Sequence, residues 1–242
     1  MTESSVAVLL FTAVSIGLVH TLIGVDHSLP FVVLGHARGW SLRKVLAITA
    51  ACGLAHVLSS VVIGVAGISV GVALERLELV EGVRGSLAAW LLIAFGLTWA
   101  TWGFIRGRRG EHHSHRHAHD DGSLHEHGHD HARQHLHAHE ATVDGRKLGF
   151  MAFWSLFLIF AFGPCEALIP MLMFPAAEHA WGVVVLVTAA FGITTIGTMM
   201  AVVGAAYVGL GRLSLHRFEK HADVFAGLAI AGSGAAISLL GL

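Results

Sequence analysis

The sequence predicts an all-α polytopic membrane protein of six transmembrane helices, built as two inverted three-helix repeats. Three observations lead to this prediction: high hydropathy, six long apolar segments, and a similar proline-marked acidic segment in each half. The mean hydropathy is +0.70, and hydrophobic residues make up 55% of the 242 residues against 13% that are charged. A soluble domain of this length could not bury so much apolar surface. The 15 Lys and Arg residues nearly balance the 16 Asp and Glu residues, so charge does not indicate a nucleic-acid partner.

The apolar segments predict the helices in order. A helix needs roughly 20 mostly apolar residues to cross about 30 Å of hydrocarbon. Six segments meet this requirement: Val6–Gly24, Val45–Val72, Ser86–Phe104, Leu148–Pro175, Gly182–Leu210 and Ala222–Leu242. The N-terminus lacks the basic start of a signal peptide, so we expect the first segment to be a retained helix. Between the second and third segments, we expect Glu75, Glu78 and Glu81 in an ordinary solvated loop.

Basic residues predict the orientation of these helices. All Lys and Arg residues except Arg76 and Arg84 lie in the first, third and fifth connections. Since positively charged loops stay in the cytoplasm, we expect both termini outside and the third connection inside. We therefore expect an integral membrane protein, located in a membrane such as the bacterial inner membrane.

The two halves resemble each other. We therefore expect a first three-helix repeat over residues 1–105, a cytoplasmic His-rich loop over 106–147 and a second three-helix repeat over 148–242. Aligning the halves by hand places Asp26 over Glu166 and Pro30 over Pro170. Three spans are an odd number, so the second repeat enters the membrane in the opposite sense. Transporters of this design bind their cargo near the midplane, at the interface of the repeats.

Each aligned acidic segment predicts an interruption of its helix. Gly24–Pro30 and Gly163–Pro170 combine glycine and proline with a carboxylate. Irregular backbone at membrane depth is tolerated where it lines a cavity, so we expect two broken or re-entrant helices that face each other. The alternative is that these segments are solvent-exposed ends of ordinary helices, above all for Asp26.

Ionisable and thiol side chains in apolar segments predict a metal path. The candidate ligands are His20, Asp26, His27, His56, Cys165 and Glu166. Such side chains are costly within a membrane and usually face a pathway or a partner. On an unbroken helix His20 and His27 would lie about 10 Å apart, too far for one ion, and a break at Gly24 would shorten this distance. Asp26 could bind the ion directly or orient a histidine ligand.

Two alternatives remain open for these candidate ligands. His56 could be a satisfied core residue, and Cys165 could be a small buried residue without a metal role. Cys52 has no polar neighbours in sequence, and we assign it to packing.

The predicted loop is crowded with histidine. Twelve of the 19 histidines lie between positions 112 and 139: His112, His113, His115, His117, His119, His125, His127, His129, His131, His135, His137 and His139. Imidazole and carboxylate bind borderline divalent ions such as nickel, cobalt, zinc and copper, and a segment of this composition need not fold to do so. The alternatives are a flexible linker or a pH-sensitive segment.

Several of these motifs resemble the nickel/cobalt transporter superfamily. Gly17–His27 resembles the His…Asp-His signature of hydrogenase- and urease-associated nickel permeases, with five residues between His20 and Asp26. Gly53–His56 is similar to the Gly/Ala-His motif of their second helix. The six spans around a His-rich loop resemble nickel/cobalt efflux proteins. This resemblance implies that His20, Asp26, His27 and His56 lie on the metal path.

The segment Gly163–Pro170 resembles the proline-marked helix break of the wider lysine-exporter-like superfamily. That superfamily also contains conductors of disulfide reductant. No one family fits every segment, so the resemblance leaves the metal and the direction of transport open.

The leading functional hypothesis is a secondary transporter of divalent transition metal ions, nickel or cobalt, with efflux favoured over uptake. Zinc and copper are further candidate ions, and no tightly bound cofactor is expected. The expected partners are the ion and the lipid bilayer, with a metallochaperone or a second copy of the chain as possible additions. No nucleotide-binding loop or hydrolytic triad is legible, so we do not expect an enzyme.

Two other hypotheses explain the same sequence. The first is a membrane thiol–disulfide electron conductor, which would need Cys52 and Cys165 to approach each other. The second is an accessory membrane protein that stores or delivers metal without transporting it.

Overall fold

The structure, a computed structural model, describes residues 2–108, 114–118, 124–128, 143–163, 165, 167–212 and 221–240. Its helices are α1 (Glu3–Ile23), the short 3-10 helix η1 (Val25–His27), α2 (Leu29–Ala37), α3 (Leu42–Ser69), α4 (Leu74–Arg108), α5 (Val143–Phe162), α6 (Leu168–Ala177), α7 (Trp181–Gly211) and α8 (Ala222–Leu240). Two short strands, β1 (Ser114–Ala118) and β2 (Leu124–Gly128), pair antiparallel, with His115 opposite His127 and His117 opposite His125.

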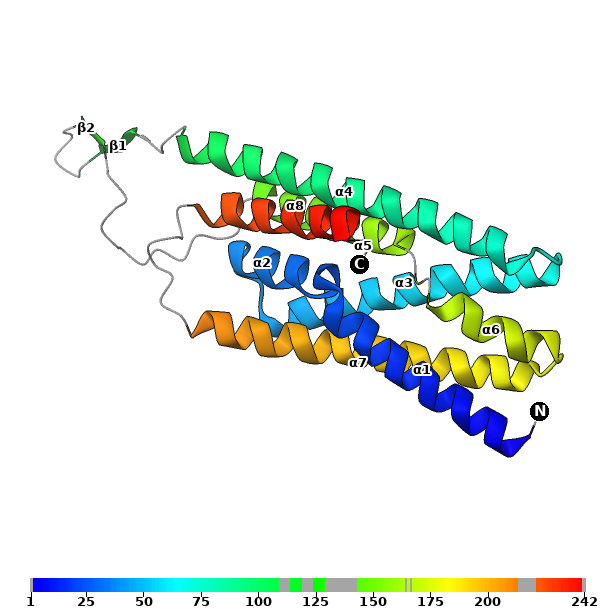
Figure 1. The fold of residues 1–242 in the computed structure, drawn as a ribbon. Helices are drawn as coiled ribbons and strands as arrows, with labels where there is room; N and C mark the ends of the chain where they lie inside the picture. The colour runs from blue at the N-terminus through cyan, green and yellow to red at the C-terminus, as the bar shows by residue number, and fades with distance from the viewer. Residues whose placement is uncertain are drawn as a thin grey trace.

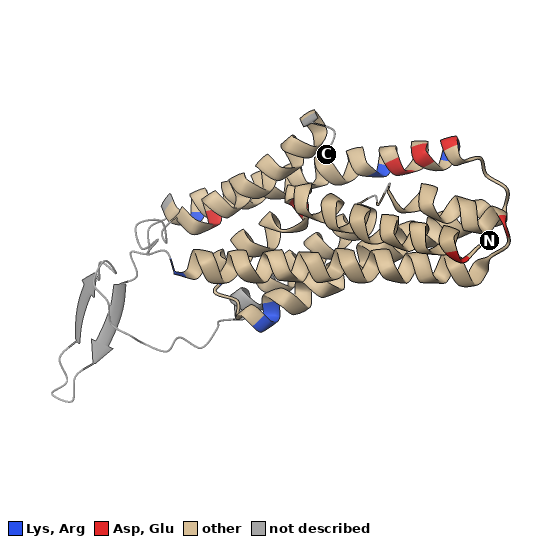
Figure 2. Ribbon diagram, turned by 60° about the horizontal axis from the view of Figure 1, so that its bottom comes forward, with Lys and Arg blue, Asp and Glu red and all other residues tan. Residues whose placement is uncertain are grey.

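The long helices run along one axis and form an elongated bundle (Figure 1). Five helices in the described part of the chain, α1, α3, α4, α7 and α8, are long and apolar enough to cross a membrane. Charged residues lie mostly toward the two ends of the bundle, and the long middle is almost free of them (Figure 2). The prediction of an α-helical protein with several apolar spans is therefore correct in outline.

The fourth predicted span, which the sequence predicts to be broken or re-entrant, is not one continuous helix. Residues Leu148–Pro175 are divided between α5 and α6, whose apolar parts, Gly149–Phe162 and Leu168–Ala177, are too short to count as spans. The α5 ladder ends where the Gly163 N–H donates to the carbonyls of Ile159 (2.8 Å) and Phe160 (3.1 Å). A proline follows Gly163 in the sequence, and a proline disfavours helical backbone in the residue before it.

The first segment is also interrupted. Helix α1 ends at Ile23, and Gly24 leaves the helix with φ −67° and ψ 97°. One turn of 3-10 helix follows before α2 begins at Leu29, with Pro30 in the first turn. A proline fits there because the first backbone N–H groups of a helix have no partner within that helix. The chain is thus interrupted at both places where glycine and proline predicted a break.

The third predicted span begins earlier than expected. Helix α4 starts at Leu74, so Glu75, Glu78 and Glu81 belong to it rather than to a loop. Glu75 and Glu78 are exposed, whereas Glu81 is completely buried. The expectation of three solvated loop residues is therefore wrong for Glu81.

Helices α4 and α8 lie side by side in the bundle (Figure 1) and touch backbone to backbone. A Cβ added at Gly227 would lie 2.4 Å from the Ala100 nitrogen and 2.5 Å from the Gly96 oxygen. Small residues at membrane helix interfaces permit such close approach. A polar contact adds to this packing, because the Trp99 Nε1–H donates to Asp223 Oδ1 at 3.2 Å.

Two apolar clusters fill the bundle. One includes Phe31, Cys52 and Leu156, and the other includes Cys165 and Phe191. The two cysteines therefore belong to different clusters, which gives the electron-conductor hypothesis no support.

We expect Gly227→Ala to destabilise the bundle by about 1–3 kcal/mol, the typical effect of overpacking a close contact. Gly232 lies on the same helix with no neighbour in reach of an added Cβ. Gly232→Ala should therefore be neutral or stabilising by up to about 1 kcal/mol, since alanine favours helix over glycine. Thermal unfolding of both variants in detergent measures the difference, and equal melting temperatures would contradict the close α4–α8 contact.

Candidate functional site

Three histidines from separate helical elements converge inside the bundle. His20 lies in the last turn of α1, His27 at the end of η1, and His56 in the middle of α3. The ring centroids are 4.8 Å apart for His20 and His27, 5.2 Å for His27 and His56, and 6.3 Å for His20 and His56. We call these three residues the histidine triad.

The break after α1 makes this convergence possible. A continuous helix would carry His27 two turns beyond His20, about 10 Å along the axis. Instead the chain leaves the helix at Gly24, and η1 folds His27 back until its ring lies edge-on to that of His20. Gly24 is needed for this path, because a Cβ there would lie only 2.2 Å from His27 Nδ1.

The triad has the dimensions of a metal site. One ligand atom from each histidine lies within 4.8 Å of the others. Among the described residues, these three side chains form the group of possible metal ligands that converges at this distance. Two nitrogens on opposite sides of an ion, each bonded at about 2.1 Å, are about 4.2 Å apart. Small ring rotations would therefore bring all three nitrogens to one ion.

The ring nitrogens of the triad are also available. Within the described part of the chain, Nε2 of His20, His27 and His56 is buried without a hydrogen-bond partner. His27 and His56 are each 3% exposed, so both rings are largely shielded from bulk solvent. Buried polar atoms normally have partners, and three unpartnered imidazole nitrogens at one place indicate a ligand.

Asp26 orients one member of the triad. Its Oδ1 lies 3.0 Å from His27 Nδ1. Since a carboxylate only accepts hydrogen bonds, Nδ1 carries a proton, and in the neutral imidazole this leaves the lone pair of Nε2 for an ion. Carboxylates that hold metal-binding histidines in this way also raise their basicity. Asp26 is thus placed to act through His27.

A cavity of about 780 Å³ adjoins the triad, and it is lined by segments of both halves of the chain. The first half contributes the triad, Asp26 and the small residues Gly82, Gly85 and Ser86 of α4. The second half contributes Phe160 and Gly163 of the α5 end, Ala167, and Ile237 and Ser238 of α8. An ion with part of its water shell would fit, since liquid water occupies about 30 Å³ per molecule.

The site lies deep in the bundle. His56 is near the middle of the 28-residue helix α3, about 20 Å from either helix end at 1.5 Å per residue. The break that carries Asp26 is beside this point rather than at an end of the bundle.

Among the described residues, Cys165 is the other predicted ligand, and the structure does not bring it to the triad. Cys165 is buried in the second apolar cluster, and its side chain is not in the converging group. Glu166 and most of the His-rich loop lie outside the described residues, and so do the loop side chains on β1 and β2. The metal roles predicted for them stay predictions.

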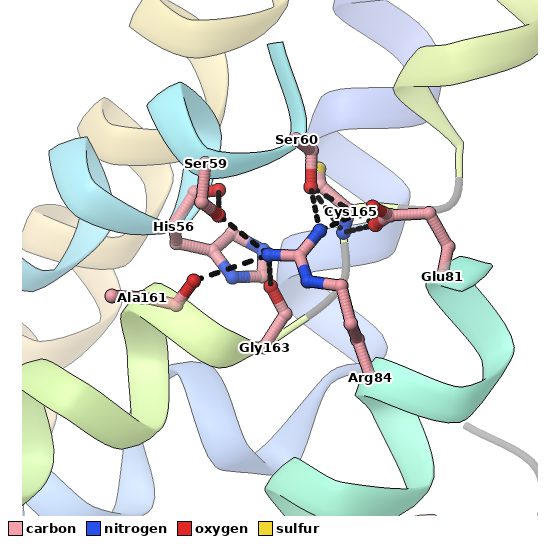
Figure 3. A network of polar contacts seen from close by, with 8 residues as sticks. All are labelled: His56, Ser59, Ser60, Glu81, Arg84, Ala161, Gly163 and Cys165. Carbon is pink, nitrogen blue, oxygen red and sulfur yellow. Dashed lines mark hydrogen bonds and ion pairs between the residues drawn. The ribbon is translucent and has the colours of Figure 1, made fainter. Parts of the chain in front are cut away.

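A second polar cluster, absent from our sequence-based expectations, lies beside His56 of the triad (Figure 3). It consists of Ser59 and Ser60 of α3, Glu81 and Arg84 of α4, and the backbone of Ala161, Gly163 and Cys165. We call it the α4 ion-pair network. The sequence shows an acid and a base three residues apart directly before an apolar span, but this spacing does not reveal that Glu81 is buried.

Comparison with known protein families identifies a match for the second half of the chain. The model of a family described as high-affinity nickel-transport protein matches residues 108–242. No curated protein and no solved structure matches the chain. The matched region holds the loop and the second half, whereas the histidine triad lies in the first half.

We expect Asp26→Asn to raise the KM for the metal ion by about 10–100-fold, the usual effect of removing a carboxylate behind a histidine ligand. The amide can still accept the Nδ1–H bond, so the loss reports the negative charge. Glu75→Gln, an exposed acid on α4, is the matched control. Transport by purified protein in liposomes measures both, and an unchanged KM in the Asp26 variant would remove Asp26 from the site.

Gly24→Ala tests the backbone path itself. The added methyl group would overlap His27 Nδ1, so we expect at least a 10-fold loss of metal transport with the protein still folded. Gly197 has no neighbour within reach of a Cβ, which makes Gly197→Ala the control. Equal transport rates for the two alanine variants would show that the His27 ring does not depend on Gly24.

Proposed function

We propose that the chain, which belongs to the high-affinity nickel-transport protein family, carries nickel across the membrane through the histidine triad. The observation that carries this proposal is the convergence of His20, His27 and His56, with unpartnered ring nitrogens, beside a cavity. The family is one of transport proteins rather than enzymes. Nickel is accordingly the transported substrate and not a resident cofactor.

The chemistry of the triad suits a transported ion. Imidazole nitrogen is a good ligand for nickel and cobalt, and neutral imidazoles do not need to lose a proton when the ion arrives. Three such ligands replace part of the water shell, and the remaining positions stay open to water in the cavity. The single carboxylate of Asp26 offsets part of the charge without binding the ion permanently.

The inverted repeat is part of the proposal. Both halves have the same order of elements: a broken helix (α1–α2 and α5–α6), then two long helices (α3–α4 and α7–α8). Corresponding helices of the two halves run in opposite directions along the bundle, as the colour gradient in Figure 1 allows the reader to follow. Rocking of one half against the other would open the cavity to each side in turn.

The proposed direction is efflux. The connection between α2 and α3, the ends of α4 and α7 and the beginnings of α5 and α8 lie at the same end of the bundle (Figure 1). The basic residues of these connections favour the cytoplasm for this end. A His-rich loop there would collect cytoplasmic ions before they enter the cavity, with cobalt as a second substrate.

We expect purified protein in liposomes that contain a metal-sensitive dye to pass nickel when nickel, cobalt, zinc and copper are added singly. His27→Ala removes one triad ligand and should reduce nickel flux to the level of empty liposomes. His221→Ala changes an exposed histidine at the start of α8 and should leave the flux unchanged.

Wild-type flux in the His27 variant would refute the triad as the transport site. If the wild-type protein bound nickel but passed no ion, the accessory metal-store hypothesis would replace transport.

A further inference from the structure

The α4 ion-pair network places two charged side chains in the interior of the bundle. The Glu81 side chain is fully buried and that of Arg84 is 11% exposed, and the two form an ion pair three residues apart on α4. A buried ion pair is weak evidence for stability, because desolvation of both charges opposes their attraction. The contacts that each partner makes beyond the pair indicate its role.

Arg84 hydrogen-bonds to backbone carbonyls at the carboxyl end of α5. Its Nη2 donates to the carbonyl oxygens of Ala161 at 3.1 Å and Gly163 at 3.3 Å. These carbonyls stand at the carboxyl end of α5, where the break leaves them without helical partners and the helix dipole is negative. A guanidinium group supplies several donors in a fixed plane and a permanent positive charge, so it suits this end.

Glu81 binds the chain just beyond the same break. Its Oε2 accepts the Cys165 backbone N–H at 3.1 Å and the Ser60 Oγ–H at 3.0 Å. The ion pair therefore holds both sides of the interruption, the carbonyls before it and the amide after it (Figure 3).

The network is joined to the triad through α3. The Ser59 Oγ–H donates to the His56 carbonyl at 2.8 Å, and Arg84 Nη2 donates to the same Ser59 oxygen at 2.8 Å. On the other side, Gly163 lies so close to the His56 ring that an added Cβ would be 3.2 Å from Nδ1. Arg84 thus contacts both the helix that carries His56 and the break that packs against its ring.

We propose that Arg84, together with Glu81, is a positioning residue for the metal site. It clamps the α5–α6 break against His56 and so holds the third imidazole in place for the ion. The inference rests on the proposed function of the triad. It assigns the second half of the chain a definite part in binding, although the three histidines of the triad all lie in the first half.

The test is transport kinetics of the full-length protein in liposomes with nickel. Arg84→Gln removes the charge and two of the three side-chain nitrogens, which frees the α5 carbonyls and loosens His56. We expect the KM for nickel to rise about 10-fold, with kcat changed less than threefold because the three ligands remain. Arg84→Lys keeps the positive charge but lacks the planar guanidinium group with its several donors. We therefore expect a KM between those of wild type and Arg84→Gln.

Two further substitutions keep the test independent of folding. Ser59→Ala removes one acceptor of Arg84 without leaving a buried charge unpaired, and we expect a smaller rise in KM in the same direction. Arg76→Gln and Glu78→Gln change exposed charges on the same helix and should have no effect.

A KM within twofold of wild type in both folded Arg84→Gln and Ser59→Ala would overturn the positioning role. A loss of kcat at constant KM in these variants would also overturn it. His27→Ala run in parallel separates the two proposals. If it loses transport while the Arg84 and Ser59 variants keep the wild-type KM, the triad stands and the clamp fails; wild-type transport in His27→Ala refutes the triad itself.

Discussion

The interruption of the first helix at Gly24 is the constraint on which the rest of the site depends. Backbone geometry alone would separate His20 and His27 by about 10 Å on a continuous helix. Only a residue without a Cβ allows the His27 ring to lie back over the chain, 4.8 Å from the ring of His20. Once His27 occupies that place, Asp26 is positioned to hold its ring, and α3 needs to contribute just one more imidazole from its middle.

A break inside an apolar bundle has a cost, since it leaves backbone groups without partners and no lipid can supply them. The backbone groups at the two breaks find hydrogen-bond partners in different ways. The first is short, and its amides bond locally, as when Gly24 N–H donates to the His20 carbonyl at 3.0 Å. The second leaves carbonyls and an amide that charged side chains of α4 satisfy. The need to satisfy a broken backbone explains why Glu81 and Arg84 are buried.

Much of the fold and part of the site could be predicted from the sequence. Glycine and proline act locally, so Gly24–Pro30 and Gly163–Pro170 identified both interruptions without knowledge of the packing. His20, His27 and His56 stood out because imidazoles are rare and costly in apolar segments. Glu81 could not be predicted, because an acid beside the exposed Glu75 and Glu78 has the same local pattern whether it faces solvent or a neighbouring helix. Its burial depends on α5 and α6, which lie more than 60 residues away in sequence.

The evidence for the family and the evidence for the site come from different halves of the chain. The family match covers residues 108–242, whereas every member of the triad precedes residue 57. The assignment of the triad therefore depends on geometry, and the membership in a nickel-transport family is independent of it. The two meet at the cavity, where Phe160 and Gly163 of the matched half pack against His56 of the other half. The proposed alternating-access carrier would use this arrangement, because an ion held by ligands on one half against a wall on the other is released when the halves separate.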